Sequence, residues 1–418
     1  PLDSAIITRA EVLNASGHVD NFSDPLVECR NCHMRFRADK EPFNLPANVD
    51  SQDTKAAKTL STIKCSNCKE INWTAPKRFN MMFKTNLGVT DDSAATVFLR
   101  PETAQGIFTN FKNIMETSRK KLPFGIAQIG KAFRNKIHTG NFILRDREFE
   151  QMELEYFVAP VTATKEWEGW VAIRHNWYLD LGMKGESLRL REHEEHEKAH
   201  YAVAATDIEY NFPGLGFSEL EGIANRSDYD LVQHQQASGR DLSYFDDSTG
   251  EKFLPYVIEP SVGLDRAMLA FLCDAYVEYP GGRQLAGPDQ NVENQQVENQ
   301  SESKAVKSVT EVETVLHLHP KLAPYKIAIL PLMRKDGLPE LAHKLADNLR
   351  NHFMISYDET ASIGKRYRRQ DEIGTPWCIT IDHDSLTNQT VTLRDRDTMA
   401  QQRMTIEEVI SYCKEKLT

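Results

Sequence analysis

Twelve consecutive residues, Asp146–Phe157, alternate between polar and apolar side chains with a period of two (DREFEQMELEYF). Successive side chains of a β-strand point to opposite faces of the sheet, so this pattern predicts a strand with one polar, functional face. Two-faced strands are typical of antiparallel sheets, whereas strands buried in parallel sheets are apolar throughout. Helical spacing occurs in four further stretches: Glu102–Lys112, Lys165–Leu181, Arg189–Ala205 and Gly263–Val277. We therefore expect an α+β fold, an antiparallel sheet flanked by helices, in the front part of the chain.

A polar segment from about Gly281 to Glu313 contains no aromatic residue and repeats the letters VENQ. Such a segment buries too little apolar surface to fold alone, which predicts a flexible linker. Behind it, short apolar strands alternate with amphipathic helices, and the last two strands are separated only by a hairpin turn. This order predicts a small α/β domain with a mixed sheet. We place the domains at 1–279, 280–315 (linker) and 316–418, with insertions at about 25–78 (cysteine pairs) and about 160–215 (helical).

Length and charge narrow the classes of protein that fit. At 100 to 200 residues per domain, a chain of 418 residues predicts two or three domains. The net charge of −11 argues against coating of nucleic acid, although it leaves room for a local basic patch. No apolar stretch is long enough for a membrane helix. The first residues show neither Met nor a secretory signal, so we expect a chain that begins within a longer protein and acts in the cytoplasm.

Four of the seven cysteines form two CxxC pairs, Cys29/Cys32 and Cys65/Cys68. Two such pairs are the usual ligand set of a structural, tetrahedral zinc site. The gap between the pairs is longer than in common zinc ribbons and holds a polar stretch that we interpret as a loop. The alternative is four reduced cysteines without metal. The odd total favours a reducing compartment over a disulfide framework.

Residues 196–200 read HEKAH, an HExxH pattern, with Glu219 and Glu221 downstream. On a helix the two histidines of such a pattern share a face and bind zinc, with Glu197 as general base of a metalloprotease. The surrounding run, REHEEHEKAH, is so rich in His and Glu that the match arises easily. The simpler interpretation is a solvated helix face.

A strand–loop–strand unit places Arg134, Arg145 and Arg147 beside Phe149 and several carboxylates. The planar guanidinium group binds phosphate and carboxylate oxygens in pairs, and an aromatic ring offers a surface on which a base stacks. The unit therefore predicts a nucleotide site. A solvated edge strand with salt bridges is the alternative. The sequence contains no P-loop, no GxGxxG after a strand and no GxSxG elbow, so the nucleotide is bound by another architecture.

This unit resembles motif 2 of the class II aminoacyl-tRNA synthetases, and Ile258–Arg266 (IEPSVGLDR) resembles their motif 3. Further strings resemble the homodimeric glycyl-tRNA synthetases: Ala15–His18, Arg100–Phe108, Glu219–Arg226 and Asp228–Leu231. The stretch Ile363–Pro376 resembles the anticodon-binding domain that these enzymes share with the threonyl, prolyl and histidyl enzymes. The resemblance covers almost the whole chain except the linker.

The resemblance implies a ligase that joins glycine to ATP as glycyl-adenylate and transfers the glycyl group to the 3′ end of tRNA(Gly). It implies that Arg134 holds the α-phosphate and the glycine carboxylate, that Arg266 holds the far end of ATP, and that Glu153 completes the catalytic set. Mg²⁺ is implied with ATP, near Glu219. The implied partners are tRNA(Gly), glycine, ATP and a second copy of the chain.

The resemblance also implies two sets of binding residues. The glycine set is Arg37, Glu102, Phe149, Glu150, Gln151, Met152, Glu153, Glu259, Pro260, Ser261, Val262 and Gly263. The ATP set is Arg134, Asn135, Lys136, Leu144, Arg145, Asp146, Arg147, Glu148, Phe149, Glu219, Leu220, Gly263, Leu264, Asp265 and Arg266. Within them, Glu102, Glu153 and Glu259 are expected to surround the glycine ammonium group, and Phe149 to stack on adenine.

Two positions depart from the family pattern. Lys136 stands where motif 2 usually has Glu, and Ala10 stands where motif 1 usually has Pro. Lys136, together with the expectation that the chain lacks the family's segment before motif 1, keeps open a second function, that of a synthetase-like factor that binds nucleotide or RNA without aminoacylation. Glycine-dependent exchange of pyrophosphate into ATP distinguishes the two.

Overall fold

The structure, a computed structural model, describes residues 1–46, 48–88, 96–137, 139–140, 142–195, 197–199, 201–283 and 312–417. The chain divides into two compact units, and each is described by itself. The first comprises Pro1–His175 and Leu188–Ala270, and the second comprises Asn176–Ser187 and Phe271–Thr418. None of the described helices is long and apolar enough to cross a membrane.

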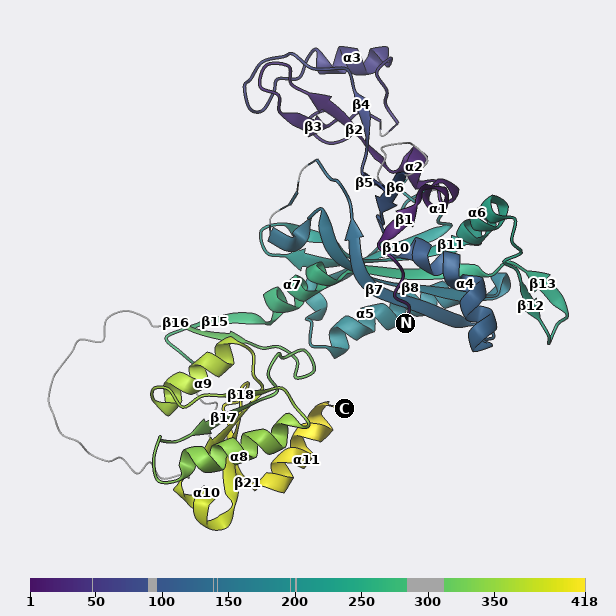
Figure 1. Cartoon of the computed structure of the whole chain (residues 1–418). Helices are drawn as coiled ribbons and strands as arrows, with labels where there is room; N and C mark the ends of the chain where they lie inside the picture. Colours follow the sequence, from purple (N-terminus) through teal and green to yellow (C-terminus); the bar gives the residue numbers. More distant parts are fainter. Residues whose placement is uncertain are drawn as a thin grey trace. The chain divides into compact units, whose positions relative to one another are not determined.

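A six-stranded sheet, antiparallel throughout, forms the centre of the first unit (Figure 1). Its strands, in spatial order, are β7 (Phe124–Phe133), β8 (Glu148–Val158), β14 (Tyr256–Gly263), β11 (Gly216–Ser227), β10 (Ala204–Phe212) and β9 (Leu188–Glu192). The alternating segment Asp146–Phe157 largely coincides with β8, and the predicted antiparallel sheet is confirmed.

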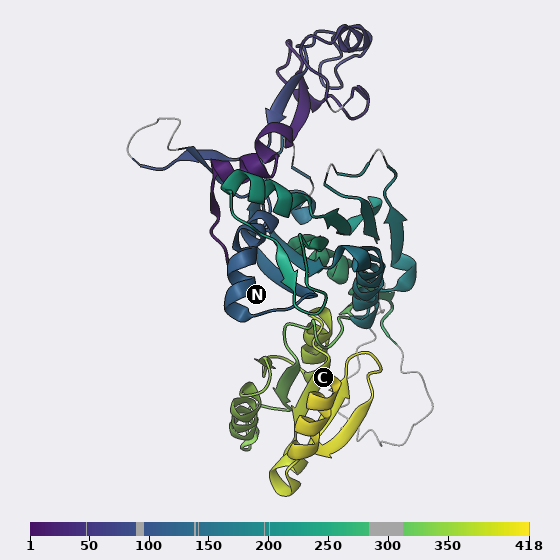
Figure 2. The ribbon, with the colours of Figure 1, turned by 90° about the vertical axis from the view of Figure 1, so that its right-hand side faces the viewer.

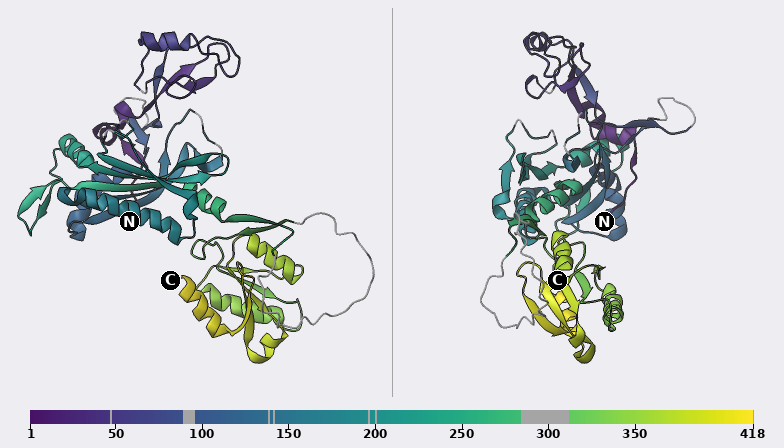
Figure 3. Two further views of the ribbon diagram at one scale, coloured as in Figure 1. Left: turned by 180° about the vertical axis from the view of Figure 1, so that it is seen from behind. Right: turned by 90° about the vertical axis from the view of Figure 1, so that its left-hand side faces the viewer.

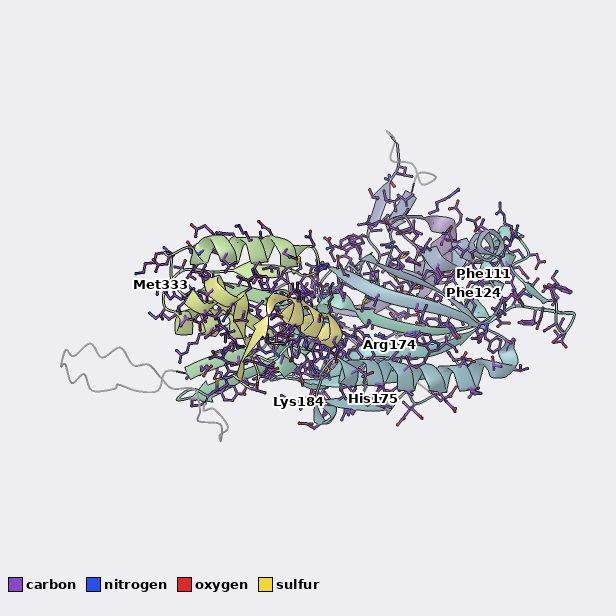
Figure 4. All side chains as sticks on the ribbon, turned by 90° about the horizontal axis from the view of Figure 1, so that it is seen from below. Phe111, Phe124, Arg174, His175, Lys184 and Met333 are labelled. Atoms are coloured by element: carbon purple, nitrogen blue, oxygen red, sulfur yellow. The ribbon has the colours of Figure 1, made fainter. Side chains whose placement is uncertain are left out.

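The two faces of β8 contact different helices, as the period of two predicts. Phe157 packs against α4 (Ala104–Ser118), where the ring centroids of Phe111 and Phe157 lie 4.4 Å apart. The neighbouring Tyr156 faces the other way, and its ring lies 5.3 Å from that of Trp170 on α5 (Ala163–Asp180). Figure 3 shows α5 running along the sheet, and Figure 4 labels Phe111 beside Phe124, on the core side, and Arg174 on α5.

The apolar core of this unit lies between α4 and the sheet. Its buried members are Ala104, Ile107, Phe108, Phe111, Phe124, Ile126, Phe157, Leu231, Leu242 and Val257. Removing a buried aromatic ring from such a core costs about 3–5 kcal/mol, so this cluster fixes the position of β8 relative to α4.

Smaller elements complete the first unit. They are α1 (Ala10–Ala15), α2 (His18–Asn21), α6 (Tyr229–Ser238), the sheet β1 (Ile7–Arg9), β6 (Thr96–Leu99) and β5 (Lys84–Asn86), and the hairpin β12 (Tyr244–Asp246) and β13 (Glu251–Phe253). Helix α7 (Leu264–Ala275) follows β14 and continues into the second unit.

The cysteine pairs lie in a small module with its own core. It consists of β2 (Ser23–Glu28), β3 (Arg35–Arg37), β4 (Lys77–Asn80) and α3 (Thr54–Leu60). Val27, Phe43, Leu45 and Leu60 are buried together there, with the rings of Phe36 and Trp73 against them. The gap between the cysteine pairs is therefore more than the polar loop we expected, because it supplies a helix and most of this core.

The second unit contains a five-stranded mixed sheet (Figure 2). Its spatial order is β18 (Ile355–Tyr357), β17 (Ile327–Pro331), β19 (Trp377–Ile381), β20 (Thr390–Asp395) and β21 (Gln401–Thr405). β17 pairs in parallel with β18 and β19, and the remaining pairs are antiparallel. The helices are α8 (Leu338–Arg350), α9 (Ile363–Glu372), α10 (His383–Asn388) and α11 (Ile406–Leu417). The predicted mixed sheet is confirmed; the short α10 was not predicted.

The helix predicted at Arg189–Ala205 is wrong. Residues Leu188–Glu192 form β9 and pair with β10, which itself begins at Ala204. Within the insertion expected to be helical at about 160–215, helix α5 accordingly ends at Asp180. Leu188 and Leu190 alternate with two arginines, a strand pattern that the His- and Glu-rich run behind it concealed.

Most of the predicted linker, residues 284–311, lies outside the described residues. On either side of it, β15 (Tyr276–Pro280) and β16 (Val312–Leu316) pair as an antiparallel hairpin. Both strands belong to the second unit. The described residues on both sides of segment 284–311 thus belong to one unit, and the role of this segment as a flexible linker stays a prediction.

Candidate active site

A cavity of about 370 Å³ opens beside β8, β11 and β14 in the first unit. It is lined by carboxylates, by four cationic side chains and by Phe149. The carboxylates on it include Glu102, Glu153, Asp207, Glu219 and Glu259, and the cationic side chains are Arg134, Lys136, Arg145 and Arg266. A site with both signs of charge suits a ligand that itself carries both.

Glu153 is held by a set of donors from three different elements. Its Oε2 accepts from the backbone N–H of Thr103 at 2.8 Å and from the Thr103 hydroxyl. Its Oε1 accepts from Ser261 Oγ at 2.9 Å and from Gln151 Nε2 at 2.5 Å. Register explains this convergence, because Glu153 lies opposite Ser261 in the β8–β14 pair. Burial and the nearby Glu102 charge raise the pKa of Glu153, against these donors.

Glu102 and Glu259 each have a partner of their own. Burial opposes the ionisation of Glu102, but the His18 ring, 3.5 Å away, and Gln105 together hold its pKa well below the usual range. Glu259 Oε1 accepts from Arg226 Nη1 at 2.8 Å. Burial nevertheless raises the pKa of Glu259 to about 8.

Backbone carbonyls fix two of the four cationic side chains, Arg134 and Arg266. Arg134 Nε donates to Pro101 O at 2.9 Å, and the guanidinium carbon lies 5.4 Å from the Phe149 ring centroid. Arg266 donates to Glu219 O at 2.6 Å and to Leu144 O at 2.8 Å. These bonds orient the two guanidinium groups without neutralising them, so their charge remains available to an anion.

Lys136 and Arg145 have unusual surroundings for cations. Burial, followed by the charges of Arg134 and Arg145, lowers the pKa of Lys136 to about 8. Burial also lowers the pKa of Arg145, whose buried Nε has no hydrogen-bond partner among the residues that the structure describes. Cations that repel one another in one cavity are stabilised when an anion enters it.

The four paired cysteines converge in the small module. All four Sγ atoms lie within 4.8 Å of one another. Each pair sits on the same kind of turn, since the residue four after the first cysteine donates its N–H back to that cysteine's carbonyl, His33 to Cys29 at 2.8 Å and Lys69 to Cys65 at 2.9 Å. Hydrogen bonds from Asn67 and from the Met34 backbone lower the pKa of Cys32 to about 6, which favours the thiolate that binds metal. This donor set fits a tetrahedral zinc ion.

Comparison with known proteins identifies the family. Residues 53–275 match the tRNA synthetase class II core domain (G, H, P, S and T), and residues 326–416 match an anticodon binding domain. The chain is 51% identical to a glycine–tRNA ligase of Clostridium kluyveri, over all of the chain and 86% of that ligase. The chain belongs to the glycine–tRNA ligase family. Ligases of Caldanaerobacter subterraneus (49%) and Clostridium perfringens (50%) match over the same shares of both chains.

This membership confirms the resemblance and the fold class expected from the sequence, and favours a glycine–tRNA ligase over both alternatives. His196 and His200, on which the metalloprotease hypothesis depends, lie outside the described residues. Glu197 between them lines the cavity and is paired with Arg191.

Most of the residues expected to bind substrates in this glycine–tRNA ligase family line the one cavity. They are Glu102, Arg134, Lys136, Leu144, Arg145, Asp146, Phe149, Glu150, Gln151, Glu153, Glu219, Leu220, Glu259, Ser261, Gly263, Asp265 and Arg266. Strand β14 contributes alternate residues, as one face of a strand does, whereas β8 also contributes the consecutive residues Phe149, Glu150 and Gln151.

Eight expected residues do not line it. Met152, Pro260 and Val262 alternate with lining residues and point to the opposite face of the sheet. Arg37 is bound instead to Asp24 at 3.1 Å and to Asp39. The other four are Asn135, Arg147, Glu148 and Leu264, of which Glu148 is paired with Lys131 at 3.0 Å.

Several site residues of this family member were missed from the sequence. Arg226 is fully buried and donates to Asp230 and Glu259, and the Tyr201 ring lies 3.9 Å from its guanidinium carbon. Arg226 is the last residue of Glu219–Arg226, one of the stretches that carried the resemblance. Sequence spacing alone, however, does not predict that this arginine is buried beside two carboxylates. Asp207, His193 and Tyr201 also line the cavity from β10 and the segment before it. The wrong helix assignment over Arg189–Ala205 hid His193 and Tyr201.

Proposed function

We propose that this chain activates glycine with ATP and transfers the glycyl group from glycyl-adenylate to the 3′ end of tRNA(Gly). The observation that carries the proposal is the cavity that combines several carboxylates, Glu102, Glu153 and Glu259 among them, with four cations, in a chain half identical to glycine–tRNA ligases. Glycine has an ammonium and a carboxylate group and ATP is a polyanion, so the substrates match both halves of the lining.

Each set of side chains has a distinct role in the proposal. Glu102, Glu153 and Glu259 surround the ammonium group, with Ser261 and Gln151 holding Glu153 in place. Arg134 bridges the glycine carboxylate and the α-phosphate, which brings nucleophile and phosphorus together, and Phe149 provides the surface for adenine. Arg266, Arg145 and Lys136 offer charge to the remaining phosphates.

The reaction follows from this placement. The glycine carboxylate attacks the α-phosphorus, pyrophosphate leaves, and the 3′ hydroxyl of tRNA then attacks the glycyl carbonyl and releases AMP. No protein nucleophile takes part. The side chains act by alignment of the reactants and by charges that are already oriented before phosphate charge develops.

Mg²⁺ fits beside the phosphates. Asp207 and Glu219 both line the cavity, and after burial the Glu219 charge is the main cause of the raised pKa of Asp207. Asp207 and Glu219 would hold a divalent ion, which would relieve that repulsion, since Mg²⁺ commonly takes one or two carboxylates plus substrate phosphates. When bound, it neutralises phosphate charge.

Selectivity for glycine is proposed to rest on exclusion. Thr103, Gln151 and Ser261 all bond to Glu153 and crowd the ammonium position. A pocket closed against one methyl group rejects larger amino acids without recognising their side chains, although one methyl is worth only about 1–3 kcal/mol. Alanine is therefore the hardest competitor.

Glycine-dependent exchange of labelled pyrophosphate into ATP tests the proposal. We expect exchange with glycine and little with alanine or serine. Arg134→Ala is expected to abolish it, whereas Arg240→Ala, at an exposed position, serves as the matched control. A folded protein that binds ATP but shows no exchange refutes the proposal in favour of a synthetase-like factor.

Three further assignments rest on the family and on chemistry. We propose that the four cysteines hold structural zinc, that the chain acts as a homodimer, and that it works in the cytoplasm, where its seven free cysteines suit a reducing environment. Metal analysis of the purified protein and light scattering test the first two.

A further inference from the structure

Glu102 is held from behind by two side chains that the mechanism above does not use. Its Oε1 accepts from Gln105 Nε2 at 2.9 Å, and its Oε2 lies 3.5 Å from His18 Nε2. Gln105 is 2% exposed, and the His18 side chain is 10% exposed. Among the described residues that line the cavity, Glu102 is present and neither His18 nor Gln105 is found. The two side chains therefore act on a substrate only through Glu102.

The turn that joins α1 to α2 orients the His18 ring. Ser16 caps α1, His18 begins α2, and Gly17 between them has a φ of 80°, a left-handed conformation that glycine adopts readily. The turn brings Ser16 Oγ to 2.8 Å from His18 Nδ1. A hydroxyl group both donates and accepts, so it satisfies Nδ1 with or without a hydrogen on that atom. Nε2 faces a carboxylate, which would repel a nitrogen lone pair, so Nε2 carries a hydrogen.

The two N–H groups of the Gln105 amide join two carboxylates. Nε2 donates to Glu102 Oε1 and also to Asp230 Oδ1, at 3.1 Å. The amide oxygen lies 2.7 Å from His234 Nε2. The opposite orientation of the amide would place this oxygen against both carboxylates, so their charge fixes the orientation and His234 is the donor to Gln105. Asp230 in turn accepts from Arg226, so Gln105 ties Glu102 to a second ion pair beside the pocket.

These contacts keep Glu102 ionised and in one orientation before a ligand enters. Hydrogen bonds to a carboxylate favour its charged form, and a buried charge without such partners is costly. The other two carboxylates of the ammonium pocket have different partners, since Glu153 accepts from Thr103 and Ser261 and Glu259 accepts from Arg226. Loss of the His18 donor should therefore change Glu102 and leave those two carboxylates in place.

We propose that His18 and Gln105 are positioning residues for glycine, which hold Glu102 ionised and oriented and so make the pocket select an ammonium group over a neutral group of the same size. This role rests on the proposed function and adds selection by charge to exclusion by size. Glycolate is the probe that separates the two, because it carries a hydroxyl group in place of the ammonium group of glycine. A carboxylate held in place binds a cation more strongly than a neutral donor, so the parent chain should bind glycine more tightly than glycolate.

Two variants of His18 separate hydrogen bonding from the filling of space. Glutamine places an N–H group near the position of Nε2, whereas methionine fills similar space without a donor. His18→Met should raise the Kd for glycine about tenfold to a hundredfold, the effect of losing one hydrogen bond to a charged group, and His18→Gln should recover most of that loss. Calorimetry measures the Kd on the full chain saturated with α,β-methylene ATP. Equally weak binding in both variants, or parent-like binding in both, overturns the inference.

Gln105→Met removes both N–H groups that join the carboxylates, and Gln236→Met, at an exposed position of α6, is the matched control. Gln105→Met should raise the Kd for glycine about tenfold or more, and the control should change it less than about twofold. The Kd for glycolate identifies the cause. Loss of a positioned charge weakens glycine and leaves glycolate within about threefold, whereas a general disturbance of the pocket weakens both by the same factor. An equal loss for the two ligands overturns the inference.

Ser16→Ala covers the case in which His18→Met or Gln105→Met does not fold. It removes only a hydroxyl group, which takes away the partner of His18 Nδ1 and lets the ring turn from Glu102. We expect a rise of about fivefold in the Kd for glycine, with the Kd for glycolate unchanged. Parent-like glycine binding in this variant overturns the inference. Absence of glycine binding by the parent chain refutes the proposed function and the inference together, whereas parent binding that all the variants retain refutes the inference alone.

Discussion

Asp371 holds together three parts of the second unit, and removing its charge should destabilise that unit. Its side chain is 1% exposed on α9. It accepts from Arg394 on β20 at 2.9 and 3.0 Å and from Arg283, next to β15, at 2.6 Å. Asp371→Asn keeps the shape but leaves Arg394 buried without a counter-charge. Breaking a buried ion pair from one side costs about 3–5 kcal/mol. We expect about 3 kcal/mol, because Arg283 retains Glu313 and the Arg396 carbonyl.

Hydrogen exchange measured by mass spectrometry resolves the two units. Exchange of the buried β19 amides should speed up by about two powers of ten, since each 1.4 kcal/mol corresponds to a factor of ten. Amides of β8, in the first unit, should keep their wild-type rates. We also expect glycine-dependent pyrophosphate exchange to survive while charging of tRNA falls, because only the unit that matches the anticodon binding domain is affected.

Glu372→Gln is the matched control for this experiment. It removes the same charge from the next residue of α9, which is exposed, and should change stability by less than about 0.5 kcal/mol. An equal loss of stability in the two variants would mean that the loss comes from the change in the charge of α9 and not from the buried ion pairs. A change below about 1 kcal/mol in Asp371→Asn would refute the reasoning outright.

Three further outcomes are expected. The parent chain should copurify with zinc, measured by a colorimetric chelator, and Cys32→Ser with Cys65→Ser should lose that zinc and melt at lower temperature; an unchanged melting curve would argue against a structural metal. The KM for ATP should rise as pH increases through about 8, because Lys136 is a cation below that value and neutral above it, and Lys136→Gln should flatten the profile. Phe149→Ala should raise the KM for ATP about tenfold or more through the loss of base stacking, with the KM for glycine little changed; equal rises in both would place the ring elsewhere.

The sequence predicted those features that repeat along the chain. The period of two in Asp146–Phe157 specified both faces of β8, and the matching alternation in β14 brings Glu259 and Ser261 to the side of Glu153. The spacing of the cysteines predicted a site whose four sulfur atoms the structure brings together. In the second unit, the stretches Tyr325–Leu330 and Cys378–Ile381 predicted the strands that the structure shows as β17 and β19.

What the sequence could not predict depends on contacts between distant segments. In the sequence nothing distinguishes Arg226 from other charged residues, and only the folded structure shows it buried against Asp230 and Glu259. Glu155 looks like Glu153 in the alternating pattern, and only the positions of the donors show that one is satisfied and the other is not. Leu188–Glu192 becomes a strand because β10 lies beside it.

The pairing of β15 with β16 makes the position between them suitable for the insertion of other sequences. Pro280 pairs with Val312, and Arg283 is tied to Glu313 through its backbone and its guanidinium group, so the two points of exit are fastened to each other. The entropy of closing a loop grows only with the logarithm of its length. A tag, a short turn or a whole reporter domain placed between Arg283 and Val312 therefore has to bridge only the width of a strand pair. The stability of the rest of the fold should depend little on the length of the inserted segment.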